Sequence, residues 1–304
     1  MNSPYPDVDW QKPVITELAA AILISKNKKL SKKYQAIPWA TLADLWINLN
    51  KQDPRKNKAL DYLENVPYIE NSFTVCQTYR FKQLLPFFKK AGITTVFTPH
   101  AEEELLDEVK IKPFPLYDPL KVDPIKERQI LYSFIGMHRS DYVSGIRQKI
   151  FRDNGHPKNS LIMERQRWHY DNVVYGEQIQ SLEKNALSDI MDHNNCEEYK
   201  DVLANSRYSL CPGGVGPSSI RFYESLRAGA IPVLLSDKMK LPEIEGLNWE
   251  NCILKIKESD YDLLREKISS ISVKQENNMR KNCYQAYKEV SGKNFTKCLR
   301  NYYE

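Results

Sequence analysis

The chain has 304 residues, of which 41% are hydrophobic and 27% are charged, and its formal net charge is +5. This mixture is typical of a soluble folded protein, so it excludes a fibrous repeat and a wholly disordered chain. The length allows about two domains, since a domain commonly takes ~150 residues. The longest apolar stretch, residues 18–24, is too short to cross a bilayer, and residues 2–10 lack the basic region of a signal peptide. The sequence therefore predicts a cytoplasmic protein.

Six cysteines are scattered along the sequence without a C-x-x-C pair. Closely spaced cysteines would indicate a zinc site or a disulfide framework, and neither pattern occurs here. We therefore expect small buried thiols in a reducing compartment.

Basic charge is concentrated between residues 26 and 33, at Lys26, Lys28, Lys29, Lys32 and Lys33. Such a cluster is either a solvated loop or a patch that attracts an anionic membrane surface, a lipid pyrophosphate or nucleic acid. No nucleic-acid-binding module accompanies it, so nucleic acid is not expected as a partner. Peripheral contact between this lysine cluster and the inner membrane stays open.

The first part of the chain predicts helices and two strands. Residues 39–50 have the pattern of a helix, and residues 73–77 and 94–98 are short runs typical of strands. Residues 79–92, between the two strands, predict a helix that ends at Gly92.

A proline-rich stretch at residues 113–124 follows, with Pro113, Pro115, Pro119 and Pro124. Because proline continues neither a helix nor a sheet ladder, this stretch is a natural linker. It divides the chain into a first predicted domain, residues 1–125, and a second, residues 126–304, with a cleft between them.

From residue 130 onward, short apolar runs alternate with longer amphipathic ones, and after residue 258 only helical patterns remain. The apolar runs predict strands at residues 130–136, 160–164, 208–211, 231–235 and 252–256. Strands that alternate with helices are typical of a parallel sheet covered by helices, so the predicted class is α/β. Ligands of such sheets bind at the carboxyl ends of strands, which indicates the loops after Cys76, Thr98, Gly136 and Cys211.

The loop after Cys211, residues 212–217 (PGGVGP), has the composition of a loop whose bare backbone can approach a ligand closely. Ser218 or Ser219 would cap a helix that runs to Ala228 and is ended by Gly229. Arg221 lies in the first turn of that helix, where the exposed amides already make the field positive. A bound anion would explain the arginine, because helix amides and a guanidinium together suit phosphate oxygens.

Glu224 lies on the same face of this helix as Arg221, three residues later. A carboxylate at that depth suits ribose hydroxyls, since it accepts hydrogen bonds from them. Two alternatives stay open: an exposed salt bridge between the two side chains, and a glycine loop that is only a tight turn. Neither the G-x-G-x-x-G pattern nor the G-x-x-x-x-G-K-[ST] pattern occurs here.

Two stretches carry a resemblance to a known family: SRYSLCPGGVGPSSIRFYESLRAGAIPVLLSD at residues 206–237 and FIGMHRSDYVSGIRQKIF at residues 134–151. They resemble the exostosin glycosyltransferases, glycosyltransferase family 47. In that family C-P is followed by a glycine-rich loop and then by S-x-R-x-Y-E-x-L-x-A-G-x-I-P-V. The resemblance is close for residues 130–237 and loose for residues 70–125.

The resemblance implies a GT-B architecture, two Rossmann-like domains that face a central cleft. The first domain would bind the acceptor and the second the nucleotide sugar, with terminal helices packing back on the first. The implied reaction is a metal-independent, inverting transfer from a nucleotide-diphosphate sugar, with UDP favoured, to a glycan or lipid-linked acceptor in surface polysaccharide synthesis. No cofactor is implied. The donor site it implies contains Arg139, Arg147, Gly214, Ser218, Ser219, Arg221 and Glu224.

The sequence departs from the family's pattern in two ways. The family commonly has an arginine directly after C-P, where this chain has Gly213. The membrane anchor and stem of the animal and plant members are also missing, which suits a soluble bacterial enzyme.

An inverting transfer needs a general base on the first-domain side of the cleft. His100, directly after the strand at residues 94–98, is the first candidate because a near-neutral pKa suits the task. Asp141, Glu102 and Glu103 are the other candidates. Tyr79 and Arg80 are expected to bind the acceptor. Two interpretations of His138, Trp168 and His169 stay open: they wall the donor pocket, or they pack in the core.

Two other functions stay open. One is a fucosyltransferase-like GT-B enzyme that uses a guanine nucleotide sugar. The other is a non-catalytic exostosin-like partner subunit, with which Gly213 in place of the arginine is compatible.

Overall fold

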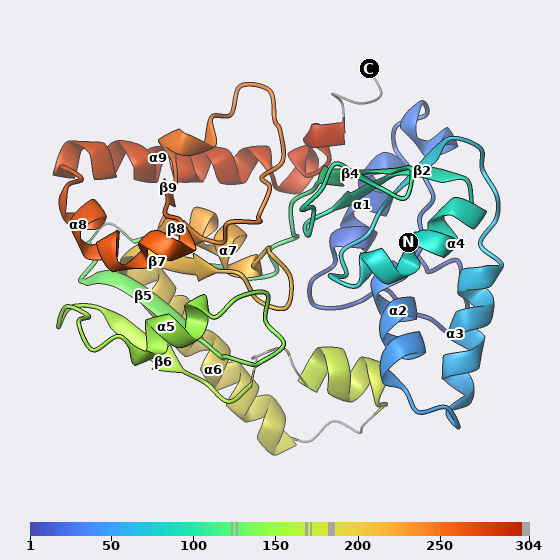
Figure 1. Ribbon diagram of the computed structural model, residues 1–304, viewed down its shortest axis with the longest axis horizontal. Helices are drawn as coiled ribbons and strands as arrows, with labels where there is room; N and C mark the ends of the chain where they lie inside the picture. Colours follow the sequence, from blue (N-terminus) through green and yellow to red (C-terminus); the bar gives the residue numbers. More distant parts are fainter. Residues whose placement is uncertain (123, 126, 168–169, 171, 182–185, 300–304) are drawn as a thin grey trace.

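The computed structural model of the chain describes residues 1–122, 124–125, 127–167, 170, 172–181 and 186–299. Two α/β lobes lie side by side, each built on its own sheet (Figure 1). We call residues 1–113 the first lobe and residues 130–299 the second lobe. In the described part of the chain the strand orders are β1-β2-β4-β3 and β6-β5-β7-β8-β9, and every pairing is parallel except that of β3 with β4. The predicted α/β class is therefore confirmed, and the two parallel sheets agree with the GT-B expectation.

The first sheet contains β1 (Ser72–Val75), β2 (Ile93–Thr98), β3 (Leu105–Leu106) and β4 (Val109–Pro113). Strands β3 and β4 form a hairpin that the sequence analysis did not identify. Its two turn residues, Asp107 and Glu108, have φ angles of 51° and 69°. Positive φ at both central residues is the geometry of a two-residue turn whose twist matches the strands.

The helices of the first lobe are α1 (Thr16–Ile24), α2 (Trp39–Asn48), α3 (Pro54–Glu64) and α4 (Leu85–Lys90). The predicted helix at residues 79–92 is divided into a 3-10 turn, η2 (Phe81–Leu84), and α4. Pro86 explains the division, because a residue without an N–H is tolerated in a first helical turn and not in a helix interior. Gly92 ends the helix with a φ of 74°, as predicted.

Helix α1 contains the apolar stretch that the sequence analysis considered only as a membrane candidate. Ala20, Ala21 and Ile24 are almost fully buried, and α1 packs against β1. In the described part of the chain, no helix combines the length and the hydropathy that a membrane span requires.

The second sheet contains β5 (Ile130–Gly136), β6 (Leu161–Glu164), β7 (Ser206–Pro212), β8 (Ile231–Leu235) and β9 (Leu254–Lys255). All five strands were predicted, with shifts of at most a few residues at their ends. The helices of this lobe are α5 (Ile146–Arg152), α6 (Ala186–Asn205), α7 (Ile220–Ala228), α8 (Leu264–Ser269) and α9 (Val273–Glu289). Short helical turns complete the chain: η1 (Leu30–Lys32), η3 (Asn172–Ile179), η4 (Trp249–Asn251), η5 (Glu258–Leu263), η6 (Gly292–Asn294) and η7 (Lys297–Leu299).

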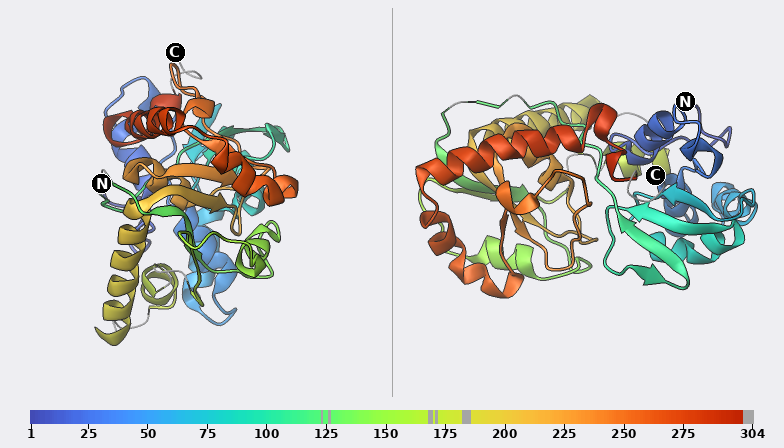
Figure 2. Two further views of the ribbon diagram at one scale, coloured as in Figure 1. Left: turned by 90° about the vertical axis from the view of Figure 1, so that its left-hand side faces the viewer. Right: turned by 90° about the horizontal axis from the view of Figure 1, so that it is seen from above.

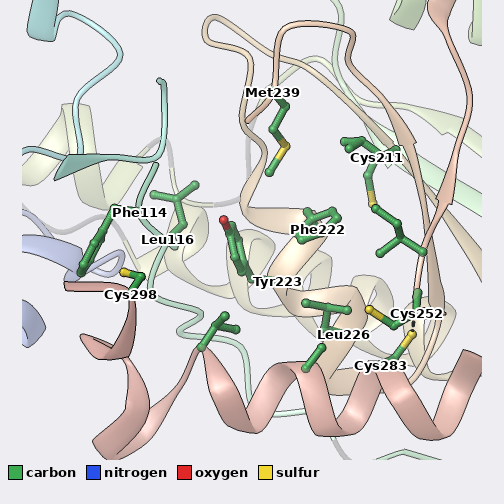
Figure 3. Close-up of a cluster of buried hydrophobic side chains, with 14 of the residues drawn as sticks. Phe114, Leu116, Cys211, Phe222, Tyr223, Leu226, Met239, Cys252, Cys283 and Cys298 are labelled. Atoms are coloured by element: carbon green, nitrogen blue, oxygen red, sulfur yellow. Dashed lines mark hydrogen bonds between the residues drawn. The ribbon is translucent and has the colours of Figure 1, made fainter. Parts of the chain in front are cut away.

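Helix α7 lies at the centre of the second lobe's core. Tyr223 and Leu226 are almost fully buried, and they lie between the linker residues Phe114 and Leu116 and helix α9 (Figure 3). The thiol of Cys283 on α9 donates to the carbonyl oxygen of Cys252 at 2.9 Å. All six cysteines have free thiols, and five of them are buried, as the sequence analysis expected.

Two segments of later sequence return toward the start of the chain, one to the first lobe and one to the linker. Segment η3 packs against α2, and the backbone amide of Lys12 donates to the side-chain oxygen of Gln178 at 2.9 Å. Beyond α9, which runs along the second lobe toward the first (Figure 2), the Phe295 ring meets the ring of Phe114 edge to face at 5.2 Å. The lobes are thus joined by packing in addition to the linker.

Candidate functional site

A cavity of about 260 Å³ lies between the two lobes. Its wall includes the loops that follow β1, β2, β5 and β7 and residues of α2 and α7. These are the loops at the carboxyl ends of strands that the sequence analysis selected. Lining residues with polar side chains are Gln11, Asp44, Gln77, Thr78, Tyr79, His100, Arg139, Tyr142, Arg147, Arg165, Arg167, Tyr199, Ser218, Ser219, Arg221 and Glu224.

The glycine loop between β7 and α7 crosses the cleft and touches the first lobe. A Cβ atom on Gly216 would lie 2.3 Å from Nδ1 of His100 and 3.0 Å from Cβ of Tyr79. Real carbon contacts are never that short, so no other residue fits here without movement of a neighbour. The loop is also held from behind, because Ser236 donates its hydroxyl to the carbonyl oxygen of Pro217 at 2.8 Å.

Arg221 is buried at the base of the cavity, with 9% of its surface exposed. Its guanidinium lies 4.5 Å from the ring centroid of Phe134, and one terminal nitrogen donates to the carbonyl oxygen of Ile135. The other terminal nitrogen, Nη1, is buried and has no hydrogen-bond partner in the described part of the structure. A buried cation with an unused donor is suited to an anionic ligand, since an unmade hydrogen bond at a charged group is costly.

Glu224 lies one turn deeper and is 1% exposed. Its Oε2 accepts a hydrogen bond from the Tyr199 hydroxyl at 2.7 Å, whereas Oε1 is buried without a partner among the described residues. Burial, followed by the negative charge of Asp118, raises the pKa of Glu224 to about 8. The alternative of an exposed Arg221–Glu224 salt bridge is wrong, because both side chains are buried.

Arg147 links the glycine loop to the loop after β5. Its Nε donates to the carbonyl oxygen of Gly213 at 2.7 Å, and its Nη1 donates to the carbonyl oxygen of Met137 at 3.0 Å. Burial, and next the positive charge of Arg221, lower the pKa of Arg147 to about 10, which leaves it a cation near neutral pH. A Cβ atom on Gly214 would lie 3.3 Å from its guanidinium, so Gly214 allows the close approach of the loop.

Arg139 also lines the cavity, but its side chain is 53% exposed. It holds the carboxylate of Asp141 with two hydrogen bonds, at 2.9 and 2.7 Å. Asp141 is exposed and does not line the cavity. The structure therefore does not bring this candidate base to the cavity wall.

His100 does line the cavity, but its pKa departs from the expectation. Burial lowers the pKa of His100 to about 4, instead of leaving it near neutral. Its Nδ1 has no hydrogen-bond partner among the described residues and faces the backbone of Gly216. Glu102 and Glu103 are paired with Lys82 at 3.3 and 3.5 Å and do not line the cavity.

The remaining predicted residues divide into wall and surroundings. Tyr79 lines the cavity, whereas Arg80 stands behind it and donates to the Tyr79 hydroxyl at 3.0 Å.

Ser219 occupies the N-cap position of α7 without a side-chain cap bond, and the buried Ser218 hydroxyl has no partner in the described part of the chain. A serine thus occupies the predicted N-cap position, but its side chain makes no capping hydrogen bond. His138 lies in the loop after β5 and does not line the cavity. Trp168 and His169 lie outside the described residues.

Sequence reasoning missed several residues of the wall. Arg165 and Arg167 follow β6 directly, and the rule of carboxyl strand ends would have selected them as well. Arg165 donates to the carbonyl oxygen of Asn195 at 2.9 Å. Gln11, Asp44 and Gln77 were missed because no local pattern relates residue 11 to residues 44 and 77. Among the described residues, no group of three or more His, Cys, Asp or Glu side chains could hold a metal ion.

Comparison with known proteins gives a family match. The family model of the Exostosin GT47 domain matches residues 90–271, more than half of the chain. An Exostosin-1 homolog of Caenorhabditis elegans is 38% identical over 93 residues, which is 30% of this chain and 24% of that protein. A probable glycosyltransferase of Arabidopsis thaliana is 32% identical over 77 residues, or 25% of this chain and 15% of that protein.

A probable glucuronosyltransferase of Oryza sativa is 39% identical over 62 residues, or 20% of this chain and 14% of that protein. The chain spans about a quarter or less of the length of these relatives. Among solved structures, the crystal structure of TarM matches with a TM-score of 0.37 at 8% identity, over 75% of this chain and 54% of that one.

Proposed function

Because the chain belongs to the exostosin GT47 family, we propose that it transfers a sugar from a nucleotide-diphosphate donor to a hydroxyl of a glycan or lipid-linked acceptor in surface polysaccharide synthesis. One observation carries the proposal. Arg221 and Glu224, neighbours on one face of α7, each keep a buried polar atom without a partner at the wall of the same cavity. A donor and an acceptor that are both unused suit a ligand that carries both an anion and hydroxyl groups.

In the proposed donor complex, Arg221 and Arg147 neutralise the diphosphate, and Arg139 adds charge from the cavity mouth. The N-terminal turn of α7 at Ser218 and Ser219 supplies further donors, and Gly214, whose own amide donates to the carbonyl oxygen of Gly216 at 2.9 Å, lets the loop approach the diphosphate. Glu224 binds the ribose hydroxyls. UDP is the favoured nucleotide, and the arginines perform the charge stabilisation that a metal supplies in other transferases.

The proposed reaction is an inverting displacement. The acceptor oxygen forms a bond to the anomeric carbon while the bond from that carbon to the β-phosphate oxygen breaks. The electron pair leaves with the nucleotide diphosphate, whose growing charge is stabilised by the buried arginines. The proton of the acceptor hydroxyl is taken by a base on the first-lobe side of the cavity.

Calorimetry with UDP and GDP tests the donor site. We expect UDP to bind the wild-type chain, and Arg221→Ala to weaken that binding at least about tenfold, since charge-assisted hydrogen bonds contribute ~1.5–3 kcal/mol. Arg152→Ala is the matched control, because Arg152 is exposed at the end of α5. Equal UDP affinity in the Arg221→Ala variant would contradict the proposed site.

The same titrations separate the other candidate functions. Preference for GDP over UDP would favour a fucosyltransferase-like enzyme with a guanine nucleotide sugar. Failure to bind either nucleotide would favour a non-catalytic partner subunit.

We also propose that the protein makes peripheral contact with the cytoplasmic face of a membrane when the acceptor is lipid-linked. The observation behind this is that the five lysines between residues 26 and 33 are all exposed, at the end of α1 and around η1. Exposed lysines attract anionic headgroups, with about 1 kcal/mol for each residue near the surface.

A further inference from the structure

The first-lobe wall of the cavity contains a carboxylate that the sequence analysis did not single out. Asp44 lies inside α2, is 3% exposed, and lines the cavity. The seven residues from Trp39 to Leu45 are all buried, so this part of the helix has no solvated face where an aspartate would ordinarily stand. An acidic side chain in such a helix requires an explanation.

The contacts of Asp44 offset its charge only in part. Its Oδ2 accepts a hydrogen bond from the Gln11 amide at 2.9 Å, and its Oδ1 accepts a longer one from the Asn48 amide at 3.3 Å. Arg80 forms a long ion pair with Asp44, in which its Nε lies 3.9 Å from Oδ1. Burying a carboxylate whose ion pair is this long costs stability, and a well-packed apolar side chain would avoid that cost.

Burial also increases the proton affinity of the Asp44 carboxylate. It raises the pKa of Asp44 to about 6, against the lowering effect of Arg80 and of the two amides. Glu17 is a second buried carboxyl near these residues, and burial raises its pKa to about 8, with a smaller contribution from the charge of Asp44. Asp44 is therefore mostly ionised at pH 7 and holds a proton more tightly than an ordinary aspartate, which suits a general base.

The carboxylate is held in place by a chain of amides. The Gln77 amide donates to the side-chain oxygen of Gln11 at 2.7 Å and to the carbonyl oxygen of Val14 at 2.8 Å. The Gln77 side-chain oxygen accepts from the backbone amide of Glu17 at 3.1 Å. These hydrogen bonds hold the Gln77 and Gln11 side chains in place, so Gln11 presents a fixed donor to Asp44. Lone pairs of the Asp44 carboxylate remain for a ligand hydroxyl.

The other candidates fit the role less well. His100, with its pKa lowered to about 4, is a weaker base than Asp44, and its Nδ1 faces the Gly216 backbone. Asp141 stands outside the cavity wall in a double hydrogen bond with Arg139.

We infer that Asp44 is the general base of the transfer, and this inference rests on the proposed function. The carboxylate accepts the hydroxyl proton of the acceptor while the hydroxyl oxygen bonds to the anomeric carbon. The nucleotide diphosphate departs toward Arg221 and Arg147 on the opposite lobe, and the protonated Asp44 then returns its proton to solvent. The first lobe thus accepts the proton of the acceptor, and the second lobe stabilises the charge of the leaving nucleotide diphosphate.

The test compares Asp44→Asn with the wild type and with Asp61→Asn, a neutralised exposed carboxylate on α3 of the same lobe. UDP release is measured with UDP-glucose, UDP-galactose, UDP-glucuronic acid and UDP-N-acetylglucosamine, each with p-nitrophenyl glycosides as acceptors. With the donor that the wild type turns over, we expect transfer by Asp44→Asn to fall about 100-fold or more, as loss of a general base does. UDP affinity should stay within about twofold of the wild-type value, and Asp61→Asn should behave as wild type.

A positioning role is separated from catalysis by two further measurements. Azide attacks the anomeric carbon without a proton to lose, so it should restore UDP release and form the glycosyl azide in Asp44→Ala. The fall of wild-type kcat/KM below about pH 6 should disappear in Asp44→Asn. Transfer within fivefold of wild type, or loss of UDP binding in both Asp44 variants, would overturn the inference. A wild-type chain that neither binds UDP nor releases it from any of the four donors would instead overturn the proposed function.

Discussion

The contact between the glycine loop and the first lobe leads to a specific prediction for Gly216→Ala. The added Cβ would lie 2.3 Å from Nδ1 of His100, whereas ordinary contacts begin at 3.4 Å. The imidazole cannot swing away freely, because His100 is 9% exposed. The loop and the first lobe must therefore separate by roughly 1 Å, beyond the range where packed atoms keep their contact energy.

We expect overpacking of this kind to cost about 1–3 kcal/mol, and hence to lower Tm by at least about 2 °C. It should also raise the Kd for UDP, because the loop that carries Gly214 and leads into α7 is displaced from the proposed donor site. Thermal unfolding and UDP calorimetry on Gly216→Ala measure both effects. Gly145→Ala is the control, since Gly145 precedes α5 in the second lobe with no atom within 4 Å of an added Cβ.

A double variant identifies the cause. In the His100→Ala background the ring is gone, so Gly216→Ala should cost clearly less there than in the wild type, although the 3.0 Å approach to Cβ of Tyr79 remains. Equal costs in the two backgrounds would refute the reasoning. So would an unchanged Tm and UDP affinity in the single variant.

Three further predictions concern charge. Because burial raises the pKa of Glu224 to about 8 from 4.5, the folded chain binds more protons than the unfolded chain between those values, and Glu224 contributes less stability as pH rises through that range. The Tm of Glu224→Gln minus the Tm of the wild type should therefore be larger at pH 8 than at pH 5. The same Tm difference at both pH values would contradict the raised pKa of Glu224. Replacing the five exposed lysines between residues 26 and 33 by glutamate should abolish sedimentation with phosphatidylglycerol vesicles at low salt, whereas undiminished binding would exclude that patch. Transfer should persist in EDTA, and activity that disappears and returns with Mn²⁺ would refute the proposed arginine-based mechanism.

The parts of the fold that sequence reasoning predicted are those in which one local signal dominates. The apolar runs at residues 130–136 and 231–235 coincide with β5 and β8, because strands buried on both faces give continuous apolar stretches. Helix α1 was missed because no local signal dominates there: its alanines and leucines leave the helix without a distinct polar face. The β3–β4 hairpin was missed because Asp107 and Glu108 are not the usual residues of a two-residue turn.

The candidate site divides in the same way. Arg221 and Glu224 were found because both lie on one helix after a glycine loop, a pattern visible within a dozen residues. Asp44 and Gln11 meet through one hydrogen bond between residues 33 positions apart, so no local pattern relates them. The lowered pKa of His100 could not be predicted either, since the burial that causes it depends on the closed cleft, where Gly216 meets the ring from the other lobe.

The structure also accounts for Gly213, where the family resemblance leads one to expect an arginine. A Cβ at this position would lie 3.0 Å from Val143 and 3.2 Å from the hydroxyl of Ser236, so the loop is too closely packed here for a long side chain to leave it freely. The Gly213 carbonyl oxygen instead accepts a hydrogen bond from Nε of Arg147 at 2.7 Å. A guanidinium thus stands against the loop after all, but it comes from α5. A different element thus supplies positive charge beside this loop, and under the proposed function this cation meets the diphosphate while the loop itself stays tightly packed.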